Sequence, residues 1–356
     1  MTNHFEKNKI NTRQINFQEV EEAMGKPVTL FDIAEACGTS NVTVSKALAG
    51  KKGVSEELRQ KIKETAVQMG YIAPGGTKKK DNNMVGVLIP EKFMNPNGSF
   101  YWALYNSLVN KFKDSDHYCL IATLSDAEEQ SLTLPRFLTD EKVTSLISLG
   151  QLSIGYVNRL KETGVPMILL DYYIADSGVD SVVTNGYVGG YELTSYLIKQ
   201  GHRNIGFIGS VKATSSIFDR YMGYMKAMFE NGLVVRREWT LDDRDDCEFI
   251  TLDFPPELPT AFVCNCDEAA YNAIRQLEMQ GISVPEDISI VGYDNYLISD
   301  VCRPAITTID VDSDLMAEKA AEALLLRIAE PDRPAQTVTI SGALIPKESV
   351  RDLNDK

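Results

Sequence analysis

From residue 84 onward, short apolar runs rich in β-branched residues alternate with longer stretches of helical periodicity. Amphipathic stretches such as 101–113, 188–200 and 268–280 separate most of these runs. Buried strands joined by helices favour parallel sheets built from β–α–β units. Because about 270 residues exceed what one doubly wound sheet usually needs, we expect two α/β lobes. The candidate strands lie at 84–89, 118–123, 145–149, 167–170, 205–209, 261–264 and 288–293.

Polar and aromatic residues follow several of these predicted strands. Ligands of parallel α/β sheets bind beyond the carboxyl ends of the strands. Carboxylates and amides hydrogen-bond hydroxyl groups, while aromatic rings stack on the apolar face of a sugar. The pattern therefore predicts a small-molecule site, most simply for a sugar. An Asp after a strand is also a common helix cap, and Asp267 can be only such a cap. The candidate effector residues are Phe100, Tyr101, Asp171, Arg220, Asn265, Cys266, Asp267 and Asp294.

The segment 27–74 has a different pattern, with three short helical stretches in place of strands. Thr29 is suited to cap the first helix, and Gly38 permits a tight turn after it. Ser40 can cap a second helix from 41 to 49, and Ser55 a third. Three short helices around a tight turn are typical of a helix-turn-helix unit, whose second helix enters the major groove of DNA.

Side chains of the second helix are the candidates for DNA contact. Asn41, Val42 and Lys46 share its exposed face and are placed to reach base edges. Short hydroxyl side chains nearby suit phosphate contacts, which position the protein without reading sequence. Spacing alone leaves open a helical bundle whose polar residues are merely solvated. The full set of candidates, including three lysines farther along the chain, is Thr29, Leu30, Ser40, Asn41, Val42, Thr43, Ser45, Lys46, Lys78, Lys79 and Lys80.

The distribution of charge supports a DNA-binding head. The chain carries a net charge of −14, yet residues 26–80 hold nine Lys and one Arg against five acidic residues. A basic segment of +5 is thus joined to a strongly acidic remainder. This asymmetry fits a DNA-binding module fused to a domain that does not bind DNA.

The segment VTLFDIAEACGTSNVTVSKALAGKKGVSEELRQKIKETAVQMGYIAP resembles the headpiece of the lactose-repressor/galactose-repressor (LacI/GalR) family along its whole length. The matching elements are T-L-x-D-I-A, the A-x-x-x-G turn, S-x-x-T-V-S-K, V-S-x-x-L-R and G-Y-I-x-P. Farther along, R-Y-M-G-Y, I-S-I-V-G-Y-D and P-A-I-T-T-I match in order. The resemblance implies an all-α helix-turn-helix headpiece followed by a two-lobed α/β sensor of the periplasmic-binding-protein-like (type I) fold.

The same resemblance implies a repressor that binds operator DNA as a homodimer and responds to a small-molecule effector. It assigns effector contacts to Asp171, Arg220 and Asp294, with Phe100 and Tyr101 nearby. Two departures prevent copying the effector from any relative. An Asn-Asp pair common at one site is Cys266-Asp267 here, with Asn265 displaced by one position, and an Asp common before Asn185 is Thr184.

The tether after the headpiece also departs from the family. Residues 74–83 read PGGTKKKDNN, a composition typical of a flexible linker. Family members carry a slightly longer segment that folds on DNA and inserts a Leu into the minor groove, and this chain has no such Leu. Lys78, Lys79 and Lys80 are placed to hold the phosphate backbone by charge, or the tether is only a spacer. The polar residues 1–26 lie outside the family pattern, and their composition is typical of disorder.

These observations divide the chain into an extension (1–26), a DNA-binding domain (27–74), a linker (75–83) and a sensor and dimerisation domain (84–356). We expect the first lobe at about 84–183 plus 308–335. The second is expected at about 184–307 plus 336–350.

Several other classes of protein are disfavoured. The sequence has no G-x-S-x-G motif and no phosphate loop, so we do not expect an enzyme or a cofactor. The six cysteines lack a disulfide or zinc spacing, and we expect reduced thiols and no metal. No apolar run reaches the ~18 residues of a membrane span, and the N-terminus lacks a secretory pattern, which predicts a cytoplasmic protein.

Two alternatives remain open at this point. One is a regulator of the same fold that responds to a nucleobase, a nucleoside or a phosphorylated metabolite. The other is a sugar-binding protein without regulatory DNA binding, which the attached headpiece argues against.

Overall fold

The computed structural model describes residues 29–48, 51, 53–69, 83–94, 100–113, 115–245 and 248–354. The chain forms two compact units, residues 1–81 and 82–356. The expected extension at 1–26 and nearly all of the expected linker lie outside the described residues. Within the described ranges, no helix is long and apolar enough to cross a membrane.

In its described residues, the smaller unit has three helices, α2 (Leu30–Cys37), α3 (Asn41–Leu48) and α4 (Glu56–Gln68). Thr29 caps α2 and forms a reciprocal capping box with Asp32, which satisfies backbone N–H groups at the helix start. Gly38 ends α2 in the left-handed conformation, at a φ of 66°, where a side chain would be strained. The buried faces of the helices meet in a small core of Ile33, Ala34, Cys37, Val44, Ala47, Ile62 and Ala66.

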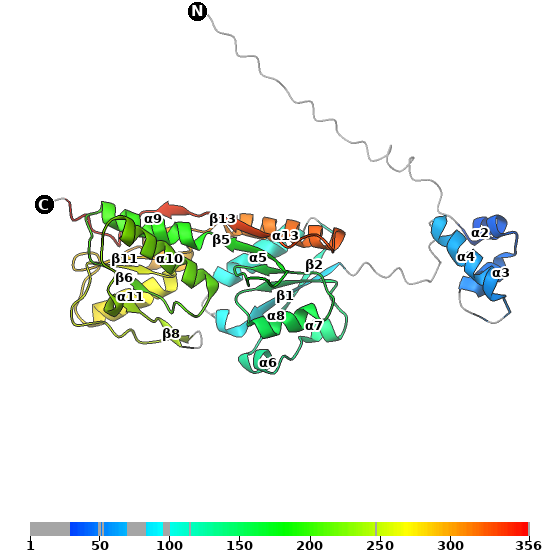
Figure 1. Cartoon of the computed structure of the whole chain (residues 1–356), viewed down its shortest axis with the longest axis horizontal. Helices are drawn as coiled ribbons and strands as arrows, with labels where there is room; N and C mark the ends of the chain where they lie inside the picture. Colours follow the sequence, from blue (N-terminus) through cyan, green and yellow to red (C-terminus); the bar gives the residue numbers. More distant parts are fainter. Residues whose placement is uncertain are drawn as a thin grey trace, which may run out of the picture. The chain divides into compact units, whose positions relative to one another are not determined.

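The larger unit begins with a lobe built on a six-stranded parallel sheet in the order β13-β5-β4-β3-β1-β2. Helices α5 (Phe100–Phe112) and α13 (Ser313–Ala329) cover one face of this sheet and α8 (Ile154–Lys161) the other (Figure 1). Val85, Val87 and Ile89 of β1 pack in the core on the first face, whereas Leu88 packs in the core on the second. This alternation is the period of two expected for a buried strand. The strands are β1 (Met84–Pro90), β2 (Tyr118–Leu124), β3 (Ser145–Leu149), β4 (Met167–Leu170), β5 (Asp180–Thr184) and β13 (Thr337–Ile340).

The second lobe has a four-stranded parallel sheet in the order β11-β10-β6-β7. Helices α9 (Gly186–Lys199) and α10 (Ser215–Glu230) cover one face, and α11 (Asp267–Met279) packs against the other. A short hairpin of β8 (Arg244–Asp245) and β9 (Glu248–Phe249) lies beside this sheet. The strands are β6 (Ile205–Ile208), β7 (Thr240–Leu241), β10 (Ala261–Cys264) and β11 (Ser289–Val291).

Smaller elements connect these layers. The first lobe also contains η1 (Glu91–Phe93), α6 (Asp126–Gln130) and α7 (Arg136–Thr139), and the second contains η2 (Arg237–Trp239) and α12 (Leu297–Val301). Strands β12 (Thr308–Asp310) and β14 (Ala343–Ile345) pair antiparallel. Every one of the seven segments predicted as strands contains a strand of the structure.

One expected lobe boundary is wrong. Residues 336–350 are expected from the sequence in the second lobe, but β13 pairs in parallel with β5, with Val338 opposite Val182. Backbone pairing with β5 therefore places 337–340 in the first sheet. The segment after β14 returns to the second lobe, where the Ile290 N–H donates to the Ser349 carbonyl. The chain thus passes between the lobes near 185, 311 and 341.

Helices α9 and α10 lie side by side at very short range (Figure 1). A Cβ atom built on Gly190 of α9 would lie 2.1 Å from the Arg220 carbonyl oxygen. One built on Gly223 of α10 would lie 2.1 Å from the Tyr187 carbonyl oxygen. Only glycine allows this approach, which fixes α10 and the Arg220 that it carries.

Candidate effector site and nucleic-acid interface

Helix α3 buries Val44 and Ala47 and leaves its other face to solvent. The predicted base-reading residues Asn41, Val42 and Lys46 are all exposed, and Val42 is 63% exposed although it is apolar. The predicted phosphate contact Ser45 is exposed as well. An apolar side chain displayed between polar ones suits contact with a thymine methyl group in the major groove.

The remaining predicted DNA contacts differ in their surroundings. Thr29 is exposed, and both its backbone N–H, at 2.6 Å, and its hydroxyl, at 2.8 Å, donate to Asp32. The backbone bond and, after it, the hydroxyl bond lower the pKa of Asp32. The Ser40 and Thr43 hydroxyls lie 2.9 Å apart at the start of α3. Leu30 is only half-buried but packs against the core of the head, so part of its surface is unavailable to DNA. The predicted contacts Lys78, Lys79 and Lys80 lie outside the described residues.

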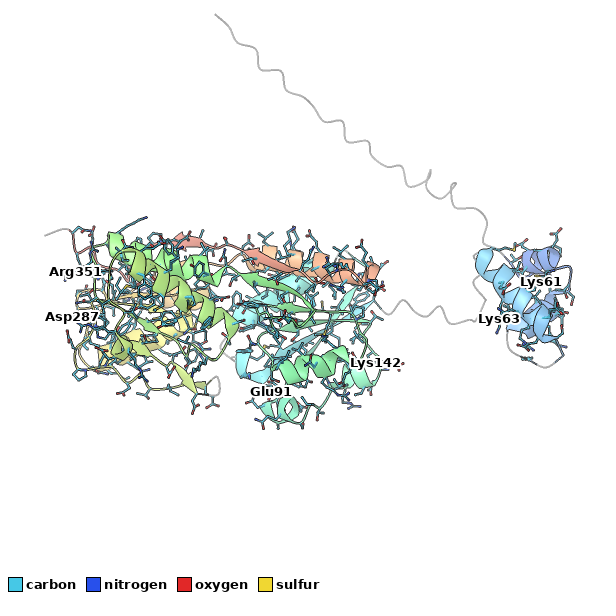
Figure 2. All side chains as sticks on the ribbon, viewed as in Figure 1. Lys61, Lys63, Glu91, Lys142, Asp287 and Arg351 are labelled. Carbon is cyan, nitrogen blue, oxygen red and sulfur yellow. The ribbon has the colours of Figure 1, made fainter. Side chains whose placement is uncertain are left out.

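Sequence reasoning missed a residue that holds α3 in place. Arg59 of α4 donates to the carbonyl oxygen of Ala47 at 3.0 Å and to that of Lys51 at 2.8 Å. The first bond satisfies a carbonyl at the end of α3 that has no partner within the helix, and the second holds the chain that follows the helix. Lys61 and Lys63, also on α4, are exposed and add to the basic surface of the head (Figure 2).

A cavity of about 360 Å³ lies where the carboxyl ends of the strands of the two lobes face each other. The first lobe contributes side chains that follow β1 and β4, and the second contributes residues from α10 and from the ends of β10 and β11. Seven of the eight predicted effector residues line this cavity: Phe100, Tyr101, Asp171, Arg220, Asn265, Cys266 and Asp294.

The structure does not bring the eighth residue, Asp267, to the cavity. Its side chain is fully buried and accepts a hydrogen bond from the Thr308 hydroxyl at 2.7 Å. It is the first residue of α11, and the cap is Cys266, whose sulfur accepts from the Ala269 N–H at 3.4 Å. Asp267 is therefore neither a cavity residue nor the cap, because the helix starts at Asp267 itself, one position earlier than a cap at Asp267 requires.

Arg220 is the central cation of the cavity. It is 5% exposed, and one guanidinium nitrogen donates to the Asn265 carbonyl at 2.5 Å while another lies 3.5 Å from the Asp294 carboxylate. The guanidinium also stacks on the Tyr293 ring, 3.8 Å from its centroid. Arg220 is thus held rigidly, so its charge is directed at a fixed point in the cavity.

Two carboxyls from different lobes face this cation. The Tyr101 hydroxyl donates to Asp171 at 2.9 Å, while the second oxygen of Asp171 has no hydrogen-bond partner within the described ranges. Burial raises the pKa of Asp171 to about 6 and that of Asp294 to about 7, although Arg220 acts in the opposite direction on both. The buried, unpartnered oxygen is an acceptor available to a ligand hydroxyl.

The backbone at these two acids is strained. Asp171 has a φ of 67° and Asp294 a φ of 111°, in the region that side chains rarely occupy. Such conformations cost on the order of 1–3 kcal/mol each and cluster at functional sites. They occur here directly after β4 and close after β11, where the chain turns away from each sheet and aims the carboxyls at the cavity.

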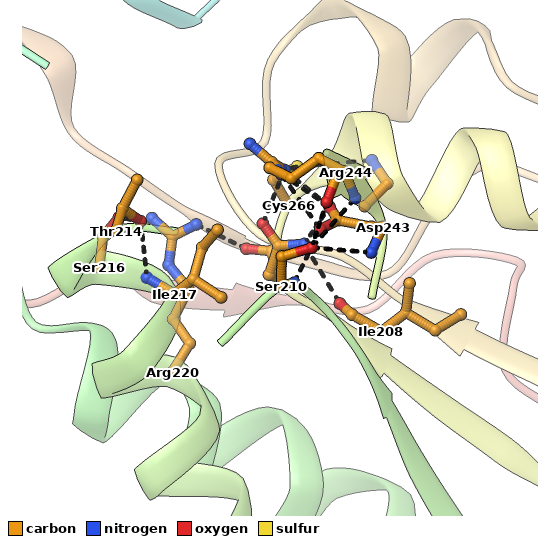
Figure 3. A network of polar contacts seen from close by, with 11 residues as sticks. Ile208, Ser210, Thr214, Ser216, Ile217, Arg220, Asp243, Arg244 and Cys266 are labelled. Atoms are coloured by element: carbon orange, nitrogen blue, oxygen red, sulfur yellow. Dashed lines mark hydrogen bonds and ion pairs between the residues drawn. The ribbon is translucent and has the colours of Figure 1, made fainter. Parts of the chain in front are cut away.

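A second arginine was not predicted from the sequence. Arg244 of the β8–β9 hairpin pairs with Asp243, with its closest contact at 2.7 Å, and donates to the Asn265 amide oxygen at 3.2 Å. Figure 3 shows Arg220 and Arg244 on opposite sides of one polar network. The only signal was a single basic residue in the acidic run LDDRDD, which has no spacing typical of a ligand site. The other lining residues that were not predicted are Lys92, Phe93, Met94, Thr214, Ser216, Ile217, Glu248, Phe249, Glu268 and Tyr296.

The arrangement is suited to binding. Burial raises the pKa of the Cys266 thiol to about 12, so the sulfur is protonated and a weak nucleophile near neutral pH. Among the described residues, no group of three or more acidic, histidine or cysteine side chains could hold a metal ion. Fixed acceptors, fixed donors and several rings converge instead, as in a site for a small polar ligand.

Comparison with known proteins identifies both units. Residues 29–73 match the family model "Bacterial regulatory proteins, lacI family", and residues 194–350 match "Periplasmic binding protein-like domain". The "HTH-type transcriptional repressor PurR" of Glaesserella parasuis serovar 5 is 28% identical to the chain, over 92% of it and 99% of that protein.

Two solved structures share the fold. The transcriptional regulator CelR in complex with cellobiose superposes with a TM-score of 0.66 and 22% identity, over 90% of this chain and 99% of that one. The lac repressor dimer bound to operator and the anti-inducer ONPF superposes with a TM-score of 0.61 and 20% identity, over 92% and 100%. The matched head, the matched sensor domain and the full-length relatives together make this chain a DNA-binding transcriptional regulator of the lacI family.

Proposed function

We propose that the chain is a transcriptional repressor that binds operator DNA as a homodimer through α3. In this proposal, an uncharged sugar bound in the cavity between the two lobes sets its affinity for the operator. A helix-turn-helix reads one half-site, so a symmetric dimer is suited to a pseudo-palindromic operator. The repressor name of its 28% identical relative supports the direction of regulation.

The observation that carries the proposal is that Asp171 of the first lobe and Asp294 of the second line the same cavity. One carboxyl belongs to each lobe, and Arg220 lies close enough to influence the pKa of both. A ligand whose hydroxyls bond to both carboxyls bridges the lobes. Such a ligand favours one angle between the lobes over others, which is what an allosteric switch requires.

The balance of charge favours an uncharged ligand. Arg220 faces Asp294 and Asp171, and Arg244 is already paired with Asp243. Two further carboxylates, Glu248 and Glu268, line the same cavity. Lys92, the remaining cation of this lining among the described residues, is already paired with Asp126 and Glu129, so a phosphate group would meet these acids without a free cation to compensate. The side chains of Phe100 and Tyr101 supply rings that suit the apolar face of a sugar.

A thermal-shift screen tests the class of ligand. Neutral monosaccharides and disaccharides are compared with glucose 6-phosphate, adenine and adenosine, for the wild type and for Asp294→Ala. A ligand at 100 times its Kd adds about 2.7 kcal/mol to the apparent stability. We expect a neutral sugar to raise the wild-type melting temperature and to leave Asp294→Ala unchanged. A shift with the phosphorylated or nucleobase probes alone would contradict the proposal.

Selection of binding sites from a random DNA library tests the role of α3. Asn41→Ala and Val42→Ala should change the preferred bases, and Lys46→Ala should weaken binding to the selected site, because all three side chains are exposed on one helix. Gln60→Ala on α4, an exposed residue that bonds to Glu64, is the matched control. An unchanged motif for both Asn41→Ala and Val42→Ala would remove these residues as readers.

A further inference from the structure

A second cavity adjoins the effector cavity and also has a volume of about 360 Å³. The two cavities share Lys92 of the first lobe and Arg244 of the second, so these two residues border both cavities. The rest of its lining comes mainly from α6 and the loop after β3. These residues are Asp126, Glu129, Gln130, Ser153 and Ala213.

The charges in the second cavity are balanced by partners already present. Lys92 lies 3.6 Å from Glu129 and 3.8 Å from Asp126. Glu129 is 9% exposed and also accepts from the Ser153 N–H at 2.7 Å. Arg244 is paired with Asp243 at 2.7 Å. An anionic group placed here would meet two carboxylates and, among the described residues that line the cavity, no unpaired cation. The cavity therefore suits an uncharged polar group.

Hydrogen-bonding capacity nevertheless remains in this cavity. The Gln130 side-chain amide has no hydrogen-bond partner within the described ranges, and it offers both donors and an acceptor. The Asp126 side chain is 55% exposed, and among the described residues its one partner is Lys92 at 3.8 Å, so its oxygens can accept from a ligand.

The two cavities differ in their apolar content. Among the described residues that line it, the second cavity has no aromatic ring, whereas Phe93, Phe100, Tyr101, Phe249 and Tyr296 line the first. A ligand ring in the first cavity can therefore be stacked and hydrogen-bonded. A ring in the second is recognised by its hydroxyls alone, which donate and accept like the side chains around them.

We propose that the effector is a disaccharide or longer neutral glycoside, with one ring in the first cavity and the next in the second. This inference rests on the proposed sugar response and adds the size of the ligand to it. Asp126 and Gln130 bind hydroxyls of the second ring, and Lys92 and Arg244 flank the link between the rings. The second ring also touches both lobes, because Arg244 and Ala213 belong to the second lobe and the other lining residues to the first.

Titration calorimetry of the full chain tests the proposal with defined probes. Glucose, galactose, ribose and fructose are compared with cellobiose, maltose, lactose and sucrose. At least one disaccharide should bind tenfold or more tightly than either of its component sugars. Asp126→Asn and Gln130→Ala should each weaken that disaccharide by about three- to tenfold, the usual effect of one lost hydrogen bond. Binding of any monosaccharide should change by less than twofold.

Asp140→Asn is the matched control, because Asp140 is an exposed acid at the end of α7 and does not line either cavity. It should change no affinity. If a monosaccharide binds as tightly as every disaccharide, and both variants bind like the wild type, the extended site is wrong while the sugar response stands. If no sugar binds while glucose 6-phosphate or a nucleobase does, both proposals fail.

Discussion

At the scale of single residues, the site depends on two acids held in an unfavourable state. Asp171 and Asp294 are buried, adopt left-handed backbone conformations and have raised pKa values. Each of these features costs stability in the free protein. A ligand that donates hydroxyls to both carboxyls offsets part of that cost, so its binding free energy depends on the ionisation of these acids.

This linkage predicts a pH-dependent affinity for the sugar effector. In the ligand-free protein, the pKa of Asp171 is about 6 and that of Asp294 about 7, mainly because both side chains are buried. Hydroxyl donors favour the ionised carboxylate, so the bound protein has lower pKa values and releases protons as it binds. Affinity should therefore rise as the pH increases from about 5 to 8 and level off above that. Calorimetry in buffers of different ionisation enthalpy measures the released protons.

The control for this prediction replaces one titrating group. Asp294→Asn should bind more weakly, and its affinity should depend less steeply on pH between 6 and 8. Asp287→Asn, at an exposed turn of the second lobe, should keep the wild-type profile. A wild-type affinity that is constant from pH 5 to 8 would show that the two acids do not change ionisation on binding.

At the scale of elements, the buried strands could be predicted because they are apolar and β-branched on both faces. Strand β5 was missed, since the run DSVVT is short and half polar, although all five residues are buried. Strand β13 was missed because it lies at the edge of its sheet, where three of its four residues keep some exposure. Its parallel pairing with β5 joins segments about 150 residues apart, which local periodicity cannot reveal.

The candidate site, like the fold, could be predicted only where a local sequence pattern marks its residues. Residues directly after buried strands were found, because the rule for parallel sheets identifies that edge. Arg244 was missed because it lies on a two-residue strand of a hairpin, where no periodicity exists. Asp267 was misassigned because the start of a helix is uncertain by one or two residues without coordinates. Here a shift of one position separates Cys266, which lines the cavity, from Asp267, which is buried in the interior.

The crossing of α9 and α10 allows a test at this scale. Gly190→Ala places a Cβ 2.1 Å from a backbone oxygen of α10, so the helices must separate and Arg220 must move. We expect at least about 2 kcal/mol of destabilisation and a melting temperature lower by roughly 4–8 °C. Sugar binding should weaken as well, because Arg220 lies on the displaced helix.

Gly155→Ala in α8 is the control for this substitution. Its Cβ would meet nothing closer than 3.9 Å, and Ala favours the helix over Gly by roughly 0.5–1 kcal/mol. The melting temperature of this variant should be unchanged or higher, and its ligand binding should be normal. Equal stability of the two variants would mean that the close helix crossing does not hold α10 in place.

At the scale of the whole molecule, function requires that the sensor lobes influence operator binding. The lobes touch each other at sites outside the cavity. The Gln151 side chain accepts from the Ser215 N–H and hydroxyl at 3.1 Å each, and the Tyr173 hydroxyl donates to Asp219 at 3.2 Å. These contacts already favour one arrangement of the two lobes, and a ligand in the cavity adds further contacts between them. Coupling of this kind is commonly worth about 1–3 kcal/mol and is reciprocal between ligand and DNA.

The most direct test of this coupling is a titration of the selected operator with wild type, Arg220→Ala, Asp294→Ala and Arg275→Ala, each with and without the sugar found by screening. Arg275 is an exposed residue of α11 and serves as the control. The sugar should change the operator Kd of wild type and Arg275→Ala by roughly 5–150-fold. Arg220→Ala and Asp294→Ala should match the ligand-free wild-type Kd and not respond to the sugar. If both variants respond to the sugar as the wild type does, the cavity between the lobes is not the effector site.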